Sequence, residues 1–501
     1  MRFLVFFFCF LVSFVSSEMQ AAEYFVPSQR VSGIGASRDD ISPEVVKART
    51  EMMIQSQTFG IMREPKAMEG ARRILSPRLQ TLFQQAERQS GVPASLIEAI
   101  AYLESWGDAN AESPAGPKGI MQISGATART MGLKVVSATR YKVTKEKVLV
   151  LQKAKGRKPY WKVVTKKTPY TVIVRDDRLV PERAVPAAAI YFAGMERRFG
   201  STDWALFAYH CGQGCVSEMM ELTRRARGIP KNEITVSRMF FSASPAWNRE
   251  LYQAVQQQMQ RDYSPTYYFR VMRAQQLLAL YRRSPVEFAT LAQQFRSDIN
   301  GASNVSRAPH RLSVWLKRDD LQFITCEQIR AASGKSLAKA LNDPEHLGYS
   351  LNVSSSTPAD LEYFQHASPS AIGTLTYIAF ETRRLYEEMK PIGEKFKPIP
   401  VISLVAPQDY ITKLNQREGL SHCSGHVFDI DYSALPVKEA EALRFVLNDL
   451  GWSGYLGFID EGRDGMHIGC SPSSREFFAS VYQEAVGLKA KNTEAAPASM
   501  N

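Results

Sequence analysis

The sequence predicts a multidomain protein with a mainly α-helical first domain that carries an inserted β-hairpin, followed by a helical spacer and a small α+β domain. Three observations support this prediction. Apolar residues recur at helical spacing from residue 76 to about residue 105, and again over 185–282. Residues 134–176 are instead rich in Val, Thr and Tyr in partial alternation, which is typical of paired strands. Further on, an apolar run at 401–405 precedes a helical pattern at 438–450, which indicates the α+β domain.

The amino-terminal end has the features of a secretory signal peptide. Arg2 is followed by an apolar run over residues 3–15, which is too short to span a bilayer comfortably. Small residues follow this run, so we predict a signal peptide over 1–17 and an exported protein; an uncleaved anchor is the alternative. Residues 18–75 are polar and irregular, and we expect a leader segment that packs on the first domain.

Glu104 is a candidate catalytic residue near the end of a predicted helix. Gly107-Asp108 is expected to terminate this helix. Glu104 follows Ile97 by seven residues and Ile100 by four, which places it on or beside the apolar face of the helix. A carboxyl group there is either bonded to nearby backbone, the more frequent case, or carries a raised pKa. A general acid that works near neutral pH needs such a raised pKa.

The residues after this helix favour the catalytic alternative. A Ser-Pro-Ala-Gly turn follows at 113–116 and a Gly-Ile-Met-Gln segment at 119–122. Together with Glu104-Ser105, and at matching spacing, these motifs resemble the lytic transglycosylases of glycoside hydrolase family 23 (the SLT domain). The resemblance covers about residues 76–285 and implies a lysozyme-like fold for that domain.

The resemblance implies a substrate and a reaction. The substrate would be the glycan strands of peptidoglycan in the periplasm, and Glu104 would cut the MurNAc-GlcNAc bond as a single acid and base. The products would carry 1,6-anhydro-MurNAc ends, with no cofactor required. Ser113, Gln122 and Tyr209 would hold the glycan, although His210 and Cys211 depart from the family's Ala-Tyr-Asn-Ala-Gly motif around Tyr209.

A lysozyme-like hydrolase is the alternative reaction class. Enzymes that hydrolyse glycosidic bonds usually place two carboxyl groups around the bond. Asp108 and Glu112 are close to Glu104 in sequence, but both fall in the predicted turn and are expected to be solvated. The sequence therefore favours transglycosylation over hydrolysis.

The predicted hairpin contains most of the positive charge of the chain. Residues 134–176 hold thirteen Lys and Arg against two acids, a net charge of +11, whereas the whole chain has a net charge of +12. Export argues against nucleic acid as the partner. We expect this basic insert to lie over the substrate cleft, where it would contact muropeptide carboxylates, wall polymers or another envelope surface; a merely solvated hairpin is the alternative.

A second cluster of functional residue types lies in the carboxy-terminal domain, predicted over 396–486. His422, Asp429 and a distant His467 provide two imidazoles and one carboxylate, the three protein ligands of a catalytic Zn²⁺ site. The pattern resembles the zinc D,D-carboxypeptidases and endopeptidases of the vancomycin-resistance type, which act on stem peptides. The resemblance makes Asp464 the catalytic base.

Several alternatives remain open in this domain. Glu461 is the other candidate base, and His426 and Asp431 are further candidate ligands. The segment after the first strand, Ala406-Pro407-Gln408, lacks the Arg of the family. The competing hypothesis is a peptidoglycan-binding or assembly protein with a degenerate carboxy-terminal domain. A helical spacer or wall-binding region is predicted over 286–395, and a disordered tail over 487–501.

Five cysteines remain after the signal peptide, and an odd number leaves at least one thiol free. A local disulfide between Cys211 and Cys215 is compatible with their spacing. Cys423 and Cys470 lie at odd offsets from His422 and His467, so on strands they would point to the opposite face and bridge behind the metal site. Cys326 would then be unpaired. Thiolate ligation of zinc is the alternative.

Overall fold

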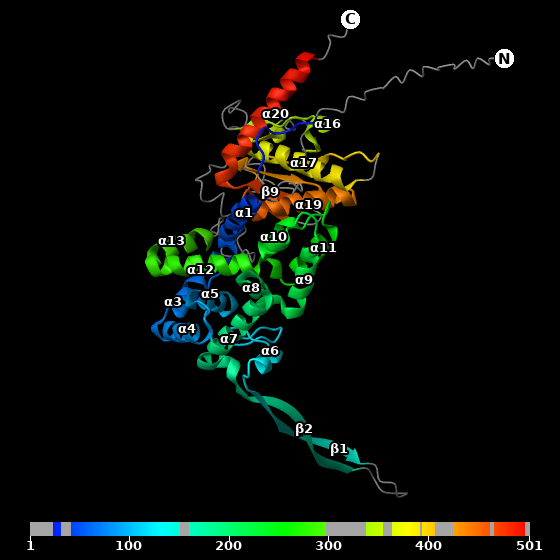
Figure 1. Ribbon diagram of the computed structural model, residues 1–501. Coiled ribbons are helices and arrows are strands. Elements are labelled where there is room, and N and C mark those ends of the chain that lie inside the picture. Colours follow the sequence, from blue (N-terminus) through cyan, green and yellow to red (C-terminus); the bar gives the residue numbers. More distant parts are fainter. Residues whose placement is uncertain are drawn as a thin grey trace, which may run out of the picture.

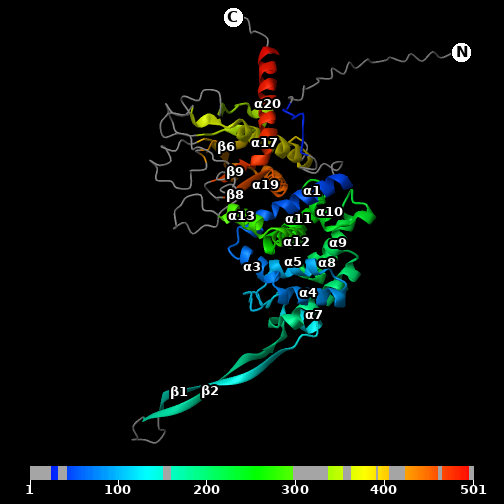
Figure 2. The ribbon, with the colours of Figure 1, turned by 90° about the vertical axis from the view of Figure 1, so that its left-hand side faces the viewer.

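The computed structural model describes residues 24–31, 42–150, 160–296, 337–353, 363–390, 393–405, 422, 424–460 and 465–495. The molecule is elongated (Figures 1 and 2): a helical domain lies in the middle, an α/β unit at one end and a two-stranded arm at the other. In this described part of the chain, no helix combines the length and the apolar character needed to cross a membrane.

The helical domain is built around the helix that carries Glu104. α5 (Ala94–Ser105) packs between α4 (Pro77–Ser90) and α12 (Tyr267–Arg283), and α7 (Pro181–Phe199) packs on α4. Proline in the first turn begins α4 and α7, and a left-handed glycine ends each of them, as helix capping favours. The other helices of the domain are α1 (Pro43–Ser56), α2 (Thr58–Met62), α3 (Ala67–Ile74), α6 (Gly125–Thr130), α8 (Thr202–Cys211), α9 (Gln213–Arg225), α10 (Val236–Ser242), α11 (Arg249–Arg261) and α13 (Pro285–Arg296).

The leader contributes directly to the end of the Glu104 helix. α5 ends at Ser105 because Trp106 adopts a left-handed conformation (φ 55°), before the expected stop at Gly107. The Tyr102 hydroxyl donates a hydrogen bond to the Ala67 carbonyl oxygen of α3 at 2.9 Å. A Cβ atom on Gly70 would lie 2.9 Å from Trp106 Cβ, so only glycine allows α3 to approach this closely.

The basic insert forms a long antiparallel hairpin, β1 (Val135–Val150) and β2 (Tyr160–Asp176). The predicted hairpin is therefore confirmed, with a register shift between Val136 and Ser137. The expectation that it lies over the substrate cleft is wrong, because both ribbon views show the strands projecting away from the helical domain (Figures 1 and 2).

The α/β unit is a five-stranded sheet in the order β4-β6-β7-β9-β8, in which only the β4–β6 pair is parallel. Helix α17, within the range expected to be a spacer, packs on α19, α20 and β9. The strands and helices are β3 (Ala338–Lys339), α16 (Pro344–Leu347), β4 (Tyr349–Leu351), β5 (His366–Ala367), α17 (Pro369–Met389), β6 (Ile399–Ser403), β7 (Val427–Ile430), α19 (Val437–Trp452), β8 (Leu456–Asp460), β9 (Met466–Cys470) and α20 (Arg475–Ala495).

Two expected boundaries need correction here. β4 pairs with β6 and α17 covers the sheet, so the described residues from 338 onward belong to the α/β unit and not to a spacer. The apolar face of α17 is buried by this packing, which a helical pattern alone cannot distinguish from a spacer helix. Likewise, α20 continues through Ala495, within the predicted tail over 487–501.

The leader contacts both units and not only the first domain. Val31 donates its backbone N–H to the Tyr377 hydroxyl of α17 at 2.9 Å, and the Ser28 hydroxyl donates to Glu484 of α20 at 2.6 Å. Arg49 of α1 forms a buried ion pair with Asp449 of α19. The leader therefore connects the helical domain to the α/β unit.

The buried Arg49–Asp449 pair should contribute strongly to stability. Asp449→Leu leaves the guanidinium buried without this carboxylate, a change that typically costs about 3–5 kcal/mol. Glu441→Gln is the matched control, because the Arg249–Glu441 pair joins the same two units at 3.2 Å but is far more exposed, and it should cost less than about 1 kcal/mol. Urea unfolding measures both changes, and equal losses in the two variants would contradict this account.

Candidate functional site

Glu104 lies in the last turn of α5, and its side chain is half-buried among protein groups. Its Oε1 atom accepts a hydrogen bond of 2.6 Å from the hydroxyl of Tyr267, the first residue of α12. Burial raises the pKa of Glu104 to about 7, although the Tyr267 hydrogen bond and the positive charge of Arg270 both act to lower it. Of the two alternatives left by the helix pattern, the raised pKa applies here, and the carboxyl can hold a proton near neutral pH.

The two nearby acids do not form a carboxylate pair with Glu104. Asp108 accepts a hydrogen bond from the backbone N–H of Asn110 at 2.9 Å, inside its own turn. Glu112 is exposed and forms an ion pair with Lys118 at 2.7 Å. In the described part of the chain, the groups that shift the pKa of Glu104 are a tyrosine and an arginine.

Tyr209 and Gln122 lie in and beside the same site. The Tyr209 hydroxyl donates to the Met121 carbonyl oxygen at 2.8 Å, and burial together with the charge of Glu104 raises the pKa of Tyr209 well above its usual value. The side-chain amide of Gln122 forms hydrogen bonds within its own loop. It donates to the Gly119 carbonyl oxygen at 3.0 Å and to the Ala111 carbonyl oxygen at 3.2 Å. The structure thus brings Tyr209 and the Gln122 loop to Glu104.

Ser113 has a mainly local role in the structure. Its hydroxyl accepts a hydrogen bond of 3.3 Å from the Ala115 backbone N–H, which fixes the Ser-Pro-Ala-Gly turn. The turn is joined to α5 further along, where the Ser105 hydroxyl donates to the Ile120 carbonyl oxygen at 2.8 Å. The Ser105 side chain therefore couples the loop to the helix that carries the candidate acid.

Three non-glycine residues in the described part of the chain have positive φ angles, and all three are near this site. Trp106 follows the Glu104 helix, Gln122 lies in the neighbouring loop, and Tyr263 precedes the short 3-10 turn that leads to Tyr267. Such backbone conformations are costly for side chains larger than glycine and cluster at functional sites. Their occurrence in the segments that flank Glu104 and lead to Tyr267 makes this region a candidate functional site.

Sequence reasoning missed Tyr267, Arg270 and the role of His210. The His210 ring stacks on Tyr267 with a centroid distance of 4.6 Å, and its Nδ1 atom is 2.9 Å from the Ser264 hydroxyl oxygen. Tyr267 is 163 residues from Glu104 in sequence. The helical pattern predicted over 185–282 includes this segment, but a helical pattern does not indicate which side chain turns toward Glu104.

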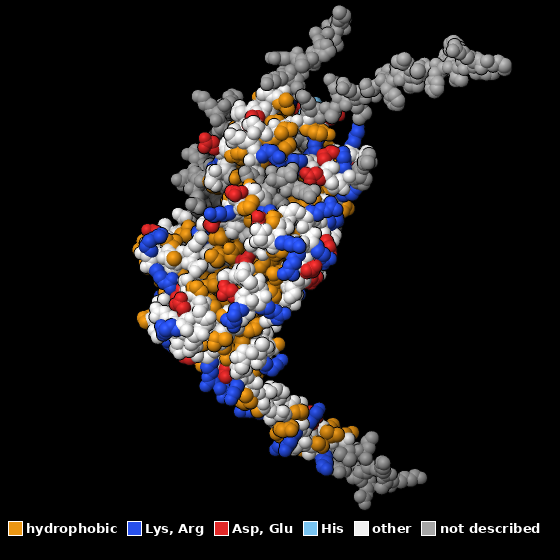
Figure 3. All heavy atoms as spheres, viewed as in Figure 1, with side chains coloured by type: hydrophobic (Ala, Val, Ile, Leu, Met, Phe, Trp, Pro, Cys, Tyr) orange, Lys and Arg blue, Asp and Glu red, His pale blue; other side chains and the backbone are white. Residues whose placement is uncertain are grey.

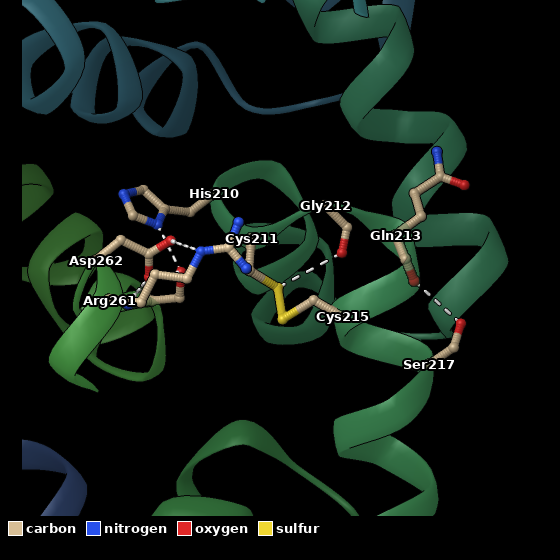
Figure 4. The surroundings of a disulfide bond; sticks show 9 residues. His210, Cys211, Gly212, Gln213, Cys215, Ser217, Arg261 and Asp262 are labelled. Atoms are coloured by element: carbon tan, nitrogen blue, oxygen red, sulfur yellow. Dashed lines mark hydrogen bonds and ion pairs between the residues drawn. A yellow bond between two sulfur atoms is a disulfide. The ribbon is translucent and has the colours of Figure 1, made fainter. Parts of the chain in front are cut away.

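The Cys211–Cys215 disulfide, which the spacing of the two residues allows, is present and closes the turn between α8 and α9 (Figure 4). The Cα atoms are 5.9 Å apart, within the usual range for a disulfide. His210, which precedes the bridge, points toward Asp262 and away from the two sulfur atoms (Figure 4). The disulfide therefore fixes the end of the helix that carries Tyr209 and His210.

The variant Tyr267→Phe tests how Glu104 is tuned. Loss of the hydroxyl donor destabilises the carboxylate form, so the pKa of Glu104 should rise above 7 and the alkaline limb of the rate profile should move to higher pH. Hydrogen bonds to charged groups contribute about 1.5–3 kcal/mol, so the rate should also fall about tenfold or more. The adjacent Tyr268→Phe is the matched control and should keep the wild-type profile. Superimposable profiles for the two variants would contradict the assignment.

The carboxy-terminal cluster brings together His422, Asp429 and His467. One ligand atom from each lies within 4.8 Å of the others. Asp429 Oδ2 is 3.0 Å from His422 Nε2, and Asp429 Oδ1 is 2.7 Å from His467 Nδ1. Asp429 and His467 face each other across the β7–β9 pair, so the sheet register itself places them together.

The hydrogen bonds of the cluster suit a metal centre. His422 donates from Nδ1 to the Leu404 carbonyl oxygen at 2.7 Å, which directs Nε2 toward Asp429; metal-binding histidines are commonly oriented this way. Burial alone would raise the pKa of Asp429, but His422 and His467 lower it well below its usual range, so the carboxylate is ionised. Two imidazoles and one carboxylate are the donor set of several catalytic zinc sites, so these residues fit Zn²⁺.

The alternative ligands are directed elsewhere. His426 Nδ1 is 3.0 Å from the Ser368 hydroxyl oxygen, and burial lowers the pKa of His426 to about 4. Asp431 accepts a hydrogen bond of 3.1 Å from the Ala434 backbone N–H and caps a short 3-10 turn. The two candidate bases, Asp464 and Glu461, lie outside the described residues.

The expected Cys423–Cys470 bridge is wrong, because Cys470 is a free, buried cysteine. Cys470 does lie on the opposite face of β9 from His467, as expected, and its thiol contacts Ser370 and Thr374 of α17. Cys423 and Cys326 lie outside the described residues. His422 precedes β7 in a tight turn and is not on a strand, which removes the geometric basis of the predicted pairing.

Residues 81–146 match the family model described as the transglycosylase SLT domain. This stretch includes Glu104, Ser113 and Gln122, together with all of the loop that follows the Glu104 helix. The match ends before Tyr209, before Tyr267 and before the metal cluster.

Comparison with curated proteins points to the same class. The chain is 28% identical to membrane-bound lytic murein transglycosylase F 2 of Alkalilimnicola ehrlichii, over 30% of this chain and 25% of the relative. It is 30% identical to membrane-bound lytic murein transglycosylase F of Alcanivorax borkumensis, over 35% of this chain and 30% of the relative. It is also 31% identical to peptidoglycan transglycosylase gp16 of Escherichia phage T7, over 26% of this chain and 8% of the relative. The chain therefore spans less than a third of the length of these relatives.

Proposed function

We propose that this protein is an exported lytic transglycosylase that cuts the MurNAc-GlcNAc bond of peptidoglycan without consuming water. The observation that supports this most directly is a single carboxyl, Glu104, whose pKa is raised to about 7 beside a tyrosine donor. The SLT-domain match over the same residues supports the substrate class. A periplasmic location follows from the substrate and from the signal-like amino terminus.

Glu104 performs both proton transfers in the proposed mechanism. In its protonated form it donates to the glycosidic oxygen and the bond to the MurNAc anomeric carbon breaks. The resulting carboxylate then takes the proton of the sugar's own 6-hydroxyl, whose oxygen bonds to the anomeric carbon and closes the anhydro ring. The Tyr267 hydroxyl and the charge of Arg270 stabilise the carboxylate between these two steps.

The surrounding loop positions the glycan. Gln122 is held by its own loop hydrogen bonds and Ser113 by its turn, so both present preorganised polar groups in the loop that follows the Glu104 helix. Tyr209 is anchored to the same loop through Met121. We assign these three residues to glycan binding and orientation, with no cofactor required.

Digestion of purified sacculi followed by mass analysis tests this proposal. A lytic transglycosylase releases muropeptides one water lighter than those released by a hydrolase. Reducing-end products of full mass would assign the protein to lysozyme-like hydrolysis, and unchanged sacculi would favour the binding or assembly alternative.

The donor set of the carboxy-terminal cluster favours a second activity. We propose that His422, Asp429 and His467 hold Zn²⁺ for cleavage of stem peptides, since their geometry fits that ion. A bound Zn²⁺ would supply a Lewis acid and lower the pKa of a water molecule. The Leu404 carbonyl oxygen accepts the hydrogen bond that orients the His422 ring. Asp464 is the proposed base. Both proposed sites would then act on one polymer, its glycan strands and its stem peptides.

A further inference from the structure

The arm formed by β1 and β2 carries exposed apolar side chains along with its positive charge. Tyr141 is 60% exposed, Val143 56% and Trp161 67%, and further Val and Leu side chains are exposed along both strands. Blue and orange side chains alternate along the arm in Figure 3. A two-stranded hairpin that projects into water is marginally stable by itself and gains from a surface that covers it.

The apolar side chains concentrate on one face of the hairpin. Directly paired residues share a face, so the register places Tyr141 opposite Pro169, Lys147 opposite Val163 and Leu149 opposite Trp161. We call this the first face; its members are Tyr141, Val143, Lys145, Lys147, Leu149, Trp161, Val163, Thr165, Lys167 and Pro169. The second face is more polar; its members are Arg140, Lys142, Thr144, Glu146, Val148, Lys162, Val164, Lys166, Thr168 and Tyr170, and the register adds the Val150–Tyr160 pair at its end.

This combination matches a lipid surface better than it matches a polysaccharide. Trp and Tyr favour the interface between headgroups and acyl chains, and nearby Lys and Arg are attracted to anionic headgroups. An anionic glycan polymer would require the positive charges, and its sugar rings could stack on Trp161, but it gives no reason for exposed Leu149 and Val163 on the same face. We propose that the first face of the arm docks on a bilayer containing anionic phospholipid.

The root of the arm is joined to the glycan site. Arg178, just beyond β2, is paired with Asp176 at 2.7 Å and donates to the Gly116 and Ile123 carbonyl oxygens, at 3.3 and 3.2 Å. A Cβ atom on Gly119 would lie 1.9 Å from the Arg178 carbonyl oxygen, so the loop and the root are in direct contact. Docking of the arm therefore sets the distance between the bilayer and Glu104, with an arm about 50 Å long for a strand of this length.

Vesicle cosedimentation of the full mature chain tests the proposal. Vesicles of phosphatidylglycerol and phosphatidylethanolamine should bind the protein, vesicles of phosphatidylcholine should bind it at least tenfold more weakly, and added salt should reduce binding. The triple variant Tyr141→Thr, Leu149→Thr, Trp161→Thr removes apolar groups of the first face and keeps every lysine. We expect it to bind anionic vesicles at least tenfold more weakly than the wild-type chain.

The matched control is Val148→Thr, Val164→Thr, Tyr170→Thr on the second face, which should bind within about threefold of wild type. Both variants keep β-forming residues and should retain cleavage of soluble glycan fragments, which verifies folding. Equal binding by the two triple variants, or equal binding to neutral and anionic vesicles, would overturn the proposal. Loss of sacculus binding by the first-face variant with unchanged vesicle binding would assign the arm to the cell wall instead and would also overturn it.

Discussion

Glu104→Gln is expected to lower the rate of anhydro-muropeptide release by about a thousandfold or more while leaving sacculus binding intact. Gln has nearly the same shape but neither donates the acid proton nor accepts one as a base, and each proton transfer contributes about 10²–10⁴-fold to a rate. The result is measured as initial rates of product release, with sacculus cosedimentation as the binding readout. Glu112→Gln, in the exposed pair with Lys118, is the matched control and should keep wild-type activity.

The pH dependence of the wild type follows from the same carboxyl. Glycan cleavage begins with the protonated acid, so the rate should fall as pH rises above about 7, the raised pKa of Glu104. The folded protein binds this proton more tightly than the unfolded chain does, so stability should fall as pH rises from about 4.5 to 7, by up to about 3 kcal/mol, and then level off. Glu104→Gln should lack this loss. A variant with the same pH-dependent stability as wild type would contradict the assigned pKa.

His467→Ala is expected to abolish metal binding and every zinc-dependent peptide cleavage while leaving glycan cleavage unchanged. Removal of one of three protein ligands leaves Asp429 and His422 unable to complete the site, so a fall of at least a hundredfold in metal affinity is expected. Zinc content of the purified protein, by elemental analysis, provides a readout that does not depend on activity. Muropeptide profiles with and without chelator provide the second readout.

His426→Ala is the matched control for this experiment. His426 lies four residues after His422 but contacts Ser368, the N-cap residue of α17, so its loss should leave the zinc content unchanged. Zinc retained by His467→Ala at the wild-type level would contradict the metal centre. Zinc lost from the variant with no change in any peptide product would leave a binding or structural metal site and remove the proposed peptidase activity.

Local patterns in the sequence predicted the elements that depend on local chemistry. The helix around Glu104 and the partly alternating strands of the basic insert follow local periodicity, and each is present. Helix α17 is also present within the range predicted to be helical. The sequence also grouped His422, Asp429 and His467, and these three residues do lie together, because the strand register brings Asp429 opposite His467. The raised pKa of Glu104 followed from its place beside an apolar face.

Features that depend on distant packing could not be predicted. Tyr267 donates to Glu104 only because α12 packs on α5, and nothing near Tyr267 in sequence indicates that contact. The prediction of a spacer over 286–395 was wrong because β4 pairs in parallel with β6. This pairing joins residues 349–351 to 399–401, with helix α17 between them in the sequence. The direction of the arm likewise depends on the packing of its root, where Arg178 contacts the loop before α6.

The most direct test of the central claim is digestion of sacculi in water enriched in heavy oxygen, followed by mass analysis of the new glycan ends. If the sugar's own 6-hydroxyl oxygen bonds to the anomeric carbon, the anhydro products will carry no label. They will also be one water lighter than reducing-end products. Incorporation of one heavy oxygen atom at each new end would show that water attacks the sugar, and would contradict the proposed transglycosylation.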